Sequence, residues 1–160
     1  MPKGKVTDVR EFGNGNINDT YLVTTDINEE TYFVLQRINT HVFKQPKLIM
    51  QNMRAFTEHM RRRASEEGYR WVMPRVLRVR EGQDSHLDSE GYFWRAITYV
   101  SGARSFDTIT SLGHAREVGY ALGMFQYLIH DLPIESLADT LDGFHVTPRY
   151  LRNFDKVFSS

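Results

Sequence analysis

Three β-prone segments joined by short polar connections fill the first quarter of the chain, and they restrict its fold more than any other feature. They span residues 6–12, 20–25 and 32–38 and are rich in the β-branched and aromatic side chains that strands prefer. Residues 13–16 (Gly-Asn-Gly-Asn) connect the first pair, and residues 26–30 connect the second pair. Parallel strands need crossovers of about a dozen residues or more, so these short connections predict an antiparallel meander.

A helix is expected after the third strand. Pro46 suits the first turn of a helix, because that position needs no backbone N–H. Apolar residues then recur at spacings of four, three and four, which predicts one buried helical face. They are Ile49, Met53, Phe56 and Met60. Residues 61–63 (Arg-Arg-Arg) are expected to end this helix, since cations are favourable at a helix C-terminus. Phosphate binding by these arginines is the alternative.

Two further strands and then only helices complete the predicted order. The strands are expected at residues 76–80 and 92–100, and residues 101–105 (Ser-Gly-Ala-Arg-Ser) interrupt the β pattern. Helical periodicity begins near Ser111. Its apolar positions are Ala115, Val118, Leu122, Phe125 and Ile129. A short helical stretch near residues 135–141 and an amphipathic segment that starts at Tyr150 follow.

This order predicts an α+β fold in two parts. Residues 1–100 are expected to form a small lobe with a five-stranded antiparallel sheet and one helix, and residues 101–105 to form a hinge. Residues 106–160 are expected to begin a helical lobe. The last apolar-periodic segment has barely begun where the sequence stops at Ser160, so this lobe is expected to be incomplete.

Composition narrows the function classes. The 160 residues hold 20 Lys+Arg and 20 Asp+Glu, so the formal charge of zero gives no electrostatic reason to expect nucleic acid or a membrane surface as a partner. There is no cysteine, which excludes disulfides, thiolate catalysis and Cys-ligated zinc. The start of the chain has no apolar signal region, and a cytoplasmic protein is expected. The six histidines lie far apart without metal-ligand spacing, so no metal site is predicted.

The segment at residues 12–20 (Phe-Gly-Asn-Gly-Asn-Ile-Asn-Asp-Thr), which contains this first turn, is the strongest local candidate for chemistry. Small residues between two strands let backbone N–H groups approach a phosphate closely, and Asn and Thr side chains nearby add hydrogen-bond donors. The pattern is neither a Walker A motif nor a dinucleotide-binding turn, because a strand follows it. The structural alternative is an ordinary Asn-Gly hairpin turn. The third strand also carries two polar residues, Gln36 and Arg37, at its centre.

Together these features resemble the small lobe of protein-kinase-like phosphotransferases. Four motifs make the resemblance specific to the aminoglycoside phosphotransferase/choline kinase superfamily, and within it to the N-acetylhexosamine 1-kinase branch. They are residues 15–21 (Gly-Asn-Ile-Asn-Asp-Thr-Tyr), 34–39 (Val-Leu-Gln-Arg-Ile-Asn) with Val42 and Phe43, 123–126 (Gly-Met-Phe-Gln) and 144–149 (Phe-His-Val-Thr-Pro-Arg).

The resemblance implies a set of nucleotide-binding residues. The glycine turn would cover the phosphates, with Asn18 and Thr20 bracing it. Gln36 falls where most relatives place a phosphate-binding Lys, and Arg37 would replace that charge only if the strand faced the other way. Tyr99 and Val100 would meet the adenine. The implied residues are Gly13, Asn14, Gly15, Asn16, Asn18, Thr20, Gln36, Arg37, Tyr99 and Val100. The first helix would supply a partner for the missing Lys from Gln51, Asn52 or Glu58.

The resemblance also implies the reaction. ATP, with magnesium as cofactor, would donate its γ-phosphoryl group to a small-molecule hydroxyl, here the anomeric hydroxyl of an N-acetylhexosamine sugar. The family's catalytic Asp and magnesium ligands would lie beyond Arg149, and nothing there matches, so neither catalytic residues nor metal ligands are predicted and the chain is expected to be an inactive N-terminal part of a kinase. Ile129-His130-Asp131-Leu132 is interpreted as a helix end rather than a catalytic loop.

Two other functions remain as alternatives. A non-catalytic protein could reuse the small lobe to bind a nucleotide or a partner, and the apolar face of residues 115–129 could then mediate self-association. A mucin-desulfating sulfatase is disfavoured, because sulfatases need a Cys or Ser in a C/S-x-P-x-R motif. Residues 147–149 (Thr-Pro-Arg) do not fit that motif.

Overall fold

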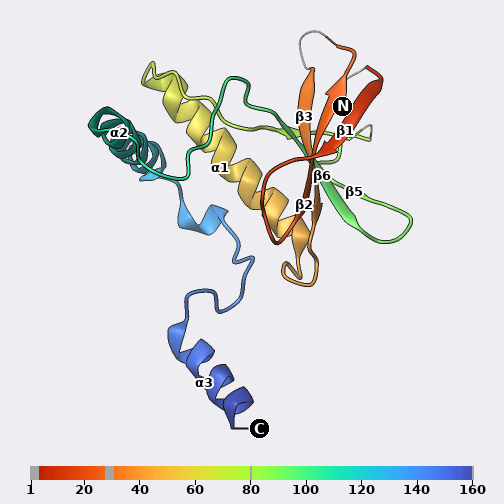
Figure 1. Cartoon of the computed structure of the whole chain (residues 1–160), viewed down its shortest axis with the longest axis vertical. Helices are drawn as coiled ribbons and strands as arrows, with labels where there is room; N and C mark the ends of the chain where they lie inside the picture. Colours follow the sequence, from red (N-terminus) through yellow and green to blue (C-terminus); the bar gives the residue numbers. More distant parts are fainter. Residues whose placement is uncertain (1–3, 28–30, 80, 160) are drawn as a thin grey trace.

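An antiparallel sheet forms most of the first hundred residues, and helices form the rest (Figure 1). The computed structural model describes residues 4–27, 31–79 and 81–159. The strands are β1 (Val6–Glu11), β2 (Asp19–Thr25), β3 (Tyr32–Ile38), β4 (Val76–Leu77), β5 (His86–Leu87) and β6 (Phe93–Thr98). The sheet order is β1-β2-β3-β6-β4, with β5 also paired to β6. All these pairs are antiparallel, so the predicted meander of the first three strands is confirmed.

The later strands differ from their predicted lengths. The strand expected over residues 76–80 is reduced to Val76–Leu77, and residue 80 lies outside the described residues, as do residues 28–30 of the expected turn. The strand expected over residues 92–100 is shorter in the structure, where β6 spans Phe93–Thr98. The short strand β5 was missed, because two residues carry no periodic signal. The predicted α+β class is nevertheless confirmed.

The helices are α1 (Pro46–Glu66), α2 (Leu112–Ile129), the 3₁₀ turn η1 (Ile134–Ser136) and α3 (Thr147–Phe158). Pro46 lies in the first turn of α1, as predicted. The prediction that residues 61–63 end the helix was wrong. Arg62 pairs with Glu66 and Arg63 with Glu67, each four residues on, and such pairs stabilise a continuing helix. At α2, the hydroxyl of Ser111 caps the helix by accepting from the His114 N–H at 3.1 Å.

Alternation along the strands decides which face of the sheet α1 covers. Directly paired residues share a face, and neighbours along a strand face opposite sides. Ile38 of β3 and Phe93 of β6 are paired, and both are buried with Met50 of α1 in one core cluster. The even-numbered residues of β3 therefore face α1, and the odd-numbered residues face the other side.

A second core cluster joins α1 to α2. Met60, Ala64 and Leu128 are buried together, and half-buried Met124, Phe125 and Ile129 pack around them. The predicted apolar stripe of α2 is therefore only partly correct. Its C-terminal members pack, whereas Val118 and Leu122 are exposed at 47% and 57%. The face of α2 that packs against α1 is rotated from the predicted stripe, because it includes Met124 and Leu128 and leaves out Leu122.

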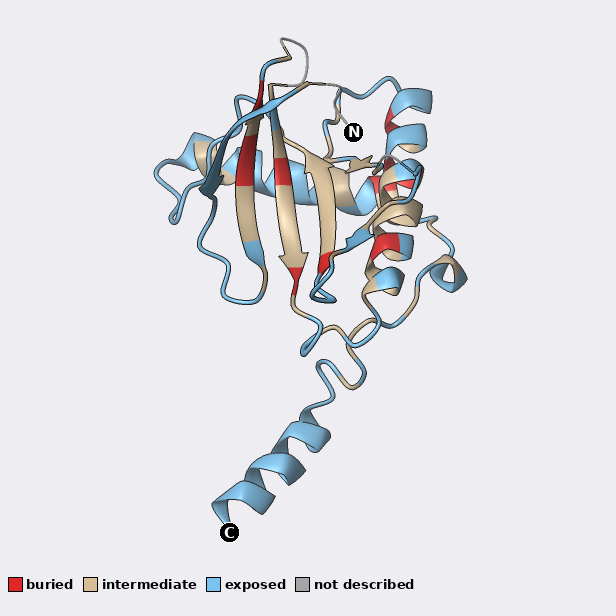
Figure 2. Cartoon of the chain, turned by 90° about the vertical axis from the view of Figure 1, so that its right-hand side faces the viewer, coloured by how far each residue is buried: buried red, intermediate tan, exposed pale blue. Residues whose placement is uncertain are grey.

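The buried residues shown in Figure 2 lie in the strands and on α1 and α2, whereas α3 is exposed along its whole length. In both views α3 stands away from the rest of the chain. No helix among the described residues is long and apolar enough to cross a membrane.

Candidate functional site

A polar row crosses three strands on the face of the sheet that α1 covers. Thr20 of β2 is paired with Gln36 of β3, and Gln36 with Arg95 of β6. The Gln36 amide Nε2 donates to the Thr20 hydroxyl at 2.9 Å. Its Oε1 accepts from both Nε and Nη2 of Arg95, at 2.9 and 2.7 Å. One glutamine amide therefore links the strand that follows the glycine turn to an arginine two strands away.

Arg95 is an unusual cation. It is only partly exposed, and its Nη1 lies 3.4 Å from the sulfur of Met53 on α1. Burial lowers the pKa of Arg95 below its usual value. Among the described residues no carboxylate lies within ion-pair distance of Arg95. Sequence reasoning missed this residue, although a lone charge inside the most β-prone segment was a usable signal.

The glycine turn is open to solvent above the strands. Gly13 has φ +84°, a left-handed conformation that favours glycine, and nothing lies within 4 Å of a Cβ placed there or at Gly15. Gly13, Gly15, Asn18 and Thr20 line a cavity of about 180 Å³. Asn14 and Asn16 are exposed.

Asn18 and Thr20 anchor the end of this turn. The Asn18 carboxamide Oδ1 accepts from the backbone N–H of Asn39 at 2.9 Å, which ties the turn to the end of β3. The Thr20 hydroxyl donates to the Asn18 carbonyl at 3.4 Å. Both contacts fix the position of the turn relative to the polar row, because Thr20 belongs to both.

An aromatic cluster lies towards the opposite end of the same face. The rings of Phe12 and Tyr99 are 5.9 Å apart, and those of Tyr32 and Tyr99 are 5.8 Å apart, both edge-on. Phe12 immediately precedes the glycine turn, so this contact brings the turn side of the hairpin to the residue that follows β6. Val100, the next residue, is half-buried. Phe12 begins the segment that the sequence singled out but was not predicted as a binding residue, and Tyr32 was not singled out.

Arg37 lies on the other face of the sheet. Its guanidinium pairs with Asp19, with Nε 2.6 Å from Oδ2, and lies 4.6 Å from the centre of the Tyr92 ring. The hydrogen bond that Arg37 donates to Asp19 is the main cause that raises the pKa of Arg37. Gln36 and Arg37 are neighbours along β3, so only Gln36 shares the face of the polar row.

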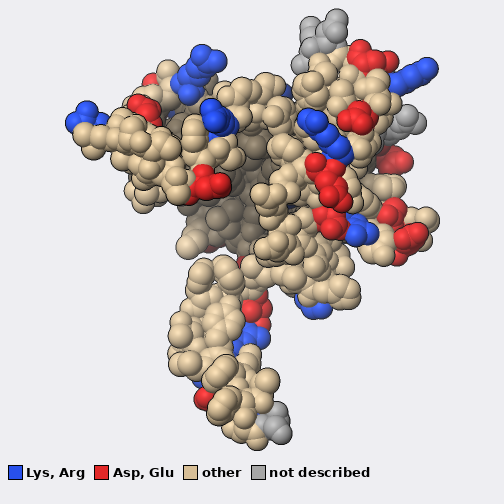
Figure 3. All heavy atoms as spheres, in the orientation of Figure 1, with Lys and Arg blue, Asp and Glu red and all other residues tan. Residues whose placement is uncertain are grey.

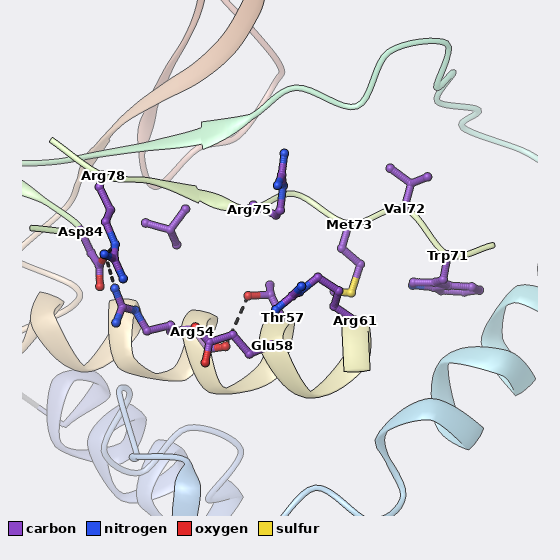
Figure 4. A pocket seen from close by; sticks show the side chains of 11 residues that line it. Arg54, Thr57, Glu58, Arg61, Trp71, Val72, Met73, Arg75, Arg78 and Asp84 are labelled. Atoms are coloured by element: carbon purple, nitrogen blue, oxygen red, sulfur yellow. Dashed lines mark hydrogen bonds and ion pairs between the residues drawn. The ribbon is translucent and has the colours of Figure 1, made fainter. Parts of the chain in front are cut away.

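The three candidates on α1 have separate surroundings. The Asn52 side chain exchanges two hydrogen bonds of 2.7 Å with the backbone of Ala138, so it holds the segment after η1. Gln51 is exposed. Glu58 lines a groove of about 570 Å³ between α1 and the chain around β4 (Figure 4). None of the three has a described hydrogen bond to Gln36 or Arg95.

This groove is lined by charged side chains. Arg54 pairs with Asp84 at 2.5 Å, and Arg78 lies 4.0 Å from the same carboxylate. Figure 4 shows Arg54 and Arg78 converging on Asp84 from α1 and from the chain that follows β4. In Figure 3, Lys and Arg alternate with Asp and Glu over the visible face and do not gather into one basic patch there.

Asp131 lies just after the end of α2, so the prediction that residues 129–132 form a helix end is confirmed. Its Oδ1 lies 3.0 Å from His59 Nε2 and 3.4 Å from Arg63 Nε, both on α1. His130 Nδ1 lies 2.7 Å from the carbonyl of Tyr127 in the last helical turn. Within the described ranges no three His, Asp or Glu side chains gather as a metal site.

The sheet order, the covering helix and the helical segment that follows define a kinase-like α+β protein. A family model described as the phosphotransferase enzyme family (APH) matches residues 8–157. The chain therefore belongs to this family. Its members are phosphotransferases that act on small molecules and generally use ATP and magnesium. The expected superfamily is confirmed at this level.

Proposed function

We propose that residues 4–105 form the ATP-binding half of a small-molecule kinase. Three features on one face support this proposal. The glycine turn leaves open space above its backbone, the polar row carries a cation, and the aromatic cluster offers a surface for a purine ring. The observation that carries the proposal is the contact of Phe12 with Tyr99, because it brings the turn to the segment that follows β6.

The spacing of these features suits a nucleoside triphosphate. Tyr32 and Gln36 lie on the same face of β3, four residues apart, which corresponds to about 13 Å along a strand. The aromatic cluster and the polar row are therefore separated by a length that an extended nucleotide spans. The base would lie beside Tyr99 and Val100, and the phosphates beneath residues 13–16, with Asn18 and Thr20 holding the turn in place.

The residues present fit the nucleotide more fully than the metal. The partly buried Arg95 and the exposed backbone of the glycine turn are both suited to phosphate oxygens. We place no magnesium ligand on the described residues. When bound, magnesium would neutralise charge that develops on the transferred phosphoryl group.

For the acceptor, we propose an N-acetylhexosamine with a free anomeric hydroxyl. This proposal rests on the motifs at residues 15–21, 34–39, 123–126 and 144–149, which resemble that branch of the family. The coarser assignment, a phosphotransferase for small molecules, rests on the family match instead. The two assignments are therefore tested separately.

Calorimetric titration with ATP and magnesium tests the nucleotide site. We expect binding of ATP and ADP, with adenosine binding more weakly. Absence of binding at millimolar ATP would contradict the proposal. The acceptor is tested by ADP release, with N-acetylglucosamine and N-acetylgalactosamine compared with glucose, choline and kanamycin. Equal rates for glucose would contradict the N-acetylhexosamine assignment.

A further inference from the structure

We infer that Arg95, held in place by Gln36, is the side chain that binds the phosphate chain of the nucleotide. The inference rests on the proposed nucleotide site and deepens it. It assigns the positive charge of the site to β6, rather than to the β3 position where the family resemblance would place a lysine.

The first reason is the unbalanced charge of Arg95. A cation that is withdrawn from water without a carboxylate partner is costly, and burial lowers the pKa of Arg95 accordingly. Other arginines of this lobe form ion pairs with carboxylates: Arg37 pairs with Asp19, and Arg54 pairs with Asp84. Arg95 instead faces the neutral amide of Gln36 and the thioether of Met53. An anionic ligand would balance this charge.

The second reason is the geometry of the guanidinium. Arginine has five N–H groups in a planar fork that matches two phosphate oxygens. The described contacts of Arg95 use at most three of them, two to the Gln36 oxygen and one to the Met53 sulfur. Two N–H groups therefore remain for a ligand. Because two hydrogen bonds to the Gln36 oxygen hold one edge of the guanidinium, little rotational freedom is lost when a phosphate binds.

The third reason is the position of the row. Gln36 donates to Thr20, the residue that also braces the glycine turn through Asn18. The cation and the turn are thus connected by consecutive hydrogen bonds on one face of the sheet. The rival cation, Arg37, lies on the opposite face and is already neutralised by Asp19.

The inference also explains why a neutral residue suits position 36. A lysine there would lie directly across from Arg95, and like charges opposite each other in a sheet are unfavourable. Glutamine supplies an acceptor to Arg95 and a donor to Thr20, which a lysine cannot do, since an ammonium group has no acceptor.

The test compares three probes by calorimetry on the full 160-residue chain: ATP, inorganic tripolyphosphate and adenosine. We expect Arg95→Met to weaken the binding of ATP and tripolyphosphate by about ten- to a hundredfold, the usual range for loss of hydrogen bonds to a charged group. Adenosine binding is expected to stay unchanged. Arg95→Lys keeps the charge and is expected to restore part of the affinity. Arg75→Met removes an exposed arginine beside β4 and serves as the charge-matched control.

The outcomes separate the inference from the proposed function. If ATP binds and Arg95→Met binds it as tightly as the unmodified chain, or if Arg37→Met causes the loss instead, the inference is overturned and the nucleotide site stands. A third outcome is that tripolyphosphate binding depends on Arg95, while ATP binds no more tightly than tripolyphosphate and adenosine does not bind. The phosphate role of Arg95 then stands, and the nucleotide proposal fails. If no probe binds to a chain that melts cooperatively, both are overturned. A melting curve for each variant shows whether it is folded.

Discussion

His59 and Asp131 join the first and second helices, with the imidazole Nε2 3.0 Å from the carboxylate Oδ1. His59 is buried at 8% exposure, whereas the Asp131 side chain is 42% exposed. Arg63, one turn further along α1, reaches the same carboxylate. Partial burial alone would raise the pKa of Asp131, but a backbone hydrogen bond, Arg63 and His59 together hold it below its ordinary value.

Asp131→Asn is therefore expected to destabilise the chain in a pH-dependent way. A carboxyl group whose pKa is lowered on folding stabilises the fold above its unfolded pKa, and this stabilisation is lost as the pH falls through its folded pKa. In urea unfolding, the variant should have a lower midpoint than the unmodified chain at pH 7, and the gap should narrow below about pH 4. Asp142→Asn is the control, because Asp142 pairs with Arg149 on the surface. A gap that widens in acid would contradict the pairing.

Met60→Ala tests the core between α1 and α2. The Met60 side chain is completely buried, so its truncation should cost about 2–5 kcal/mol of the free energy of unfolding. Leu122→Ala, on the exposed face of α2, should change it by less than about 0.5 kcal/mol. Chemical denaturation measures both. Equal losses at the two positions would mean that α2 packs with a different face than the one described.

Gln36→Leu tests the polar row independently of any ligand. The change removes one hydrogen bond to Thr20 and two from Arg95, and it leaves the Met53 sulfur as the one described acceptor of the guanidinium. A loss of about 1.5–3 kcal/mol is expected from the free energy of unfolding. Thr20→Val keeps both bonds between Gln36 and Arg95, removes the bond from Gln36 and the long bond to the Asn18 carbonyl, and should cost about 1 kcal/mol. A Gln36→Leu chain as stable as the unmodified one would show that Arg95 finds other partners.

The two glycines of the turn give a matched pair. Gly13→Ala forces a side chain into a left-handed conformation, which costs about 1–2 kcal/mol. Gly15 has no positive φ and open space around it, so Gly15→Ala should leave the melting temperature unchanged. If phosphate approaches the backbone at Gly15, the same methyl group should weaken ATP binding. A variant with unaltered stability and unaltered ATP affinity would favour the ordinary hairpin turn.

Self-association through the 115–129 helix stays a prediction. Val118, Tyr120 and Leu122 are exposed at 47%, 61% and 57% on α2. Leu122→Gln should shift the sedimentation coefficient towards that of a monomer. Leu151→Gln on α3 is matched in exposure, at 57%, and should leave sedimentation unchanged. The reverse pattern would assign association to α3.

Local patterns predicted most of the sheet. The strand Tyr32–Ile38 has its predicted bounds, because β-branched and aromatic residues fill it and turn residues flank it. The α1 stripe was correct for the same kind of reason, since Met60 lies at the predicted spacing and is buried. The end of α1 was wrong, because i,i+4 ion pairs extended it past Arg63.

The sequence predicted the candidate site less completely than it predicted the sheet. The family motifs selected Gln36, but its partner Arg95 lies 59 residues away and is brought opposite it only by the pairing of β3 with β6. The contact between Phe12 and Tyr99 likewise depends on how the hairpin curves over the sheet. Such long-range placements follow from strand order and twist, which no local window contains.

Helix α1 contacts both the polar row of the sheet and helix α2. Met53 meets the guanidinium of Arg95, and Phe56, three positions on, lies with its ring 5.8 Å from that of Phe125 on α2. Within one turn of a continuous helix, the backbone hydrogen bonds fix the positions of two residues relative to each other. The same turn of α1 therefore joins the packing of α2 to the surroundings of the Arg95 guanidinium, and the position of one helix fixes the environment of the cation.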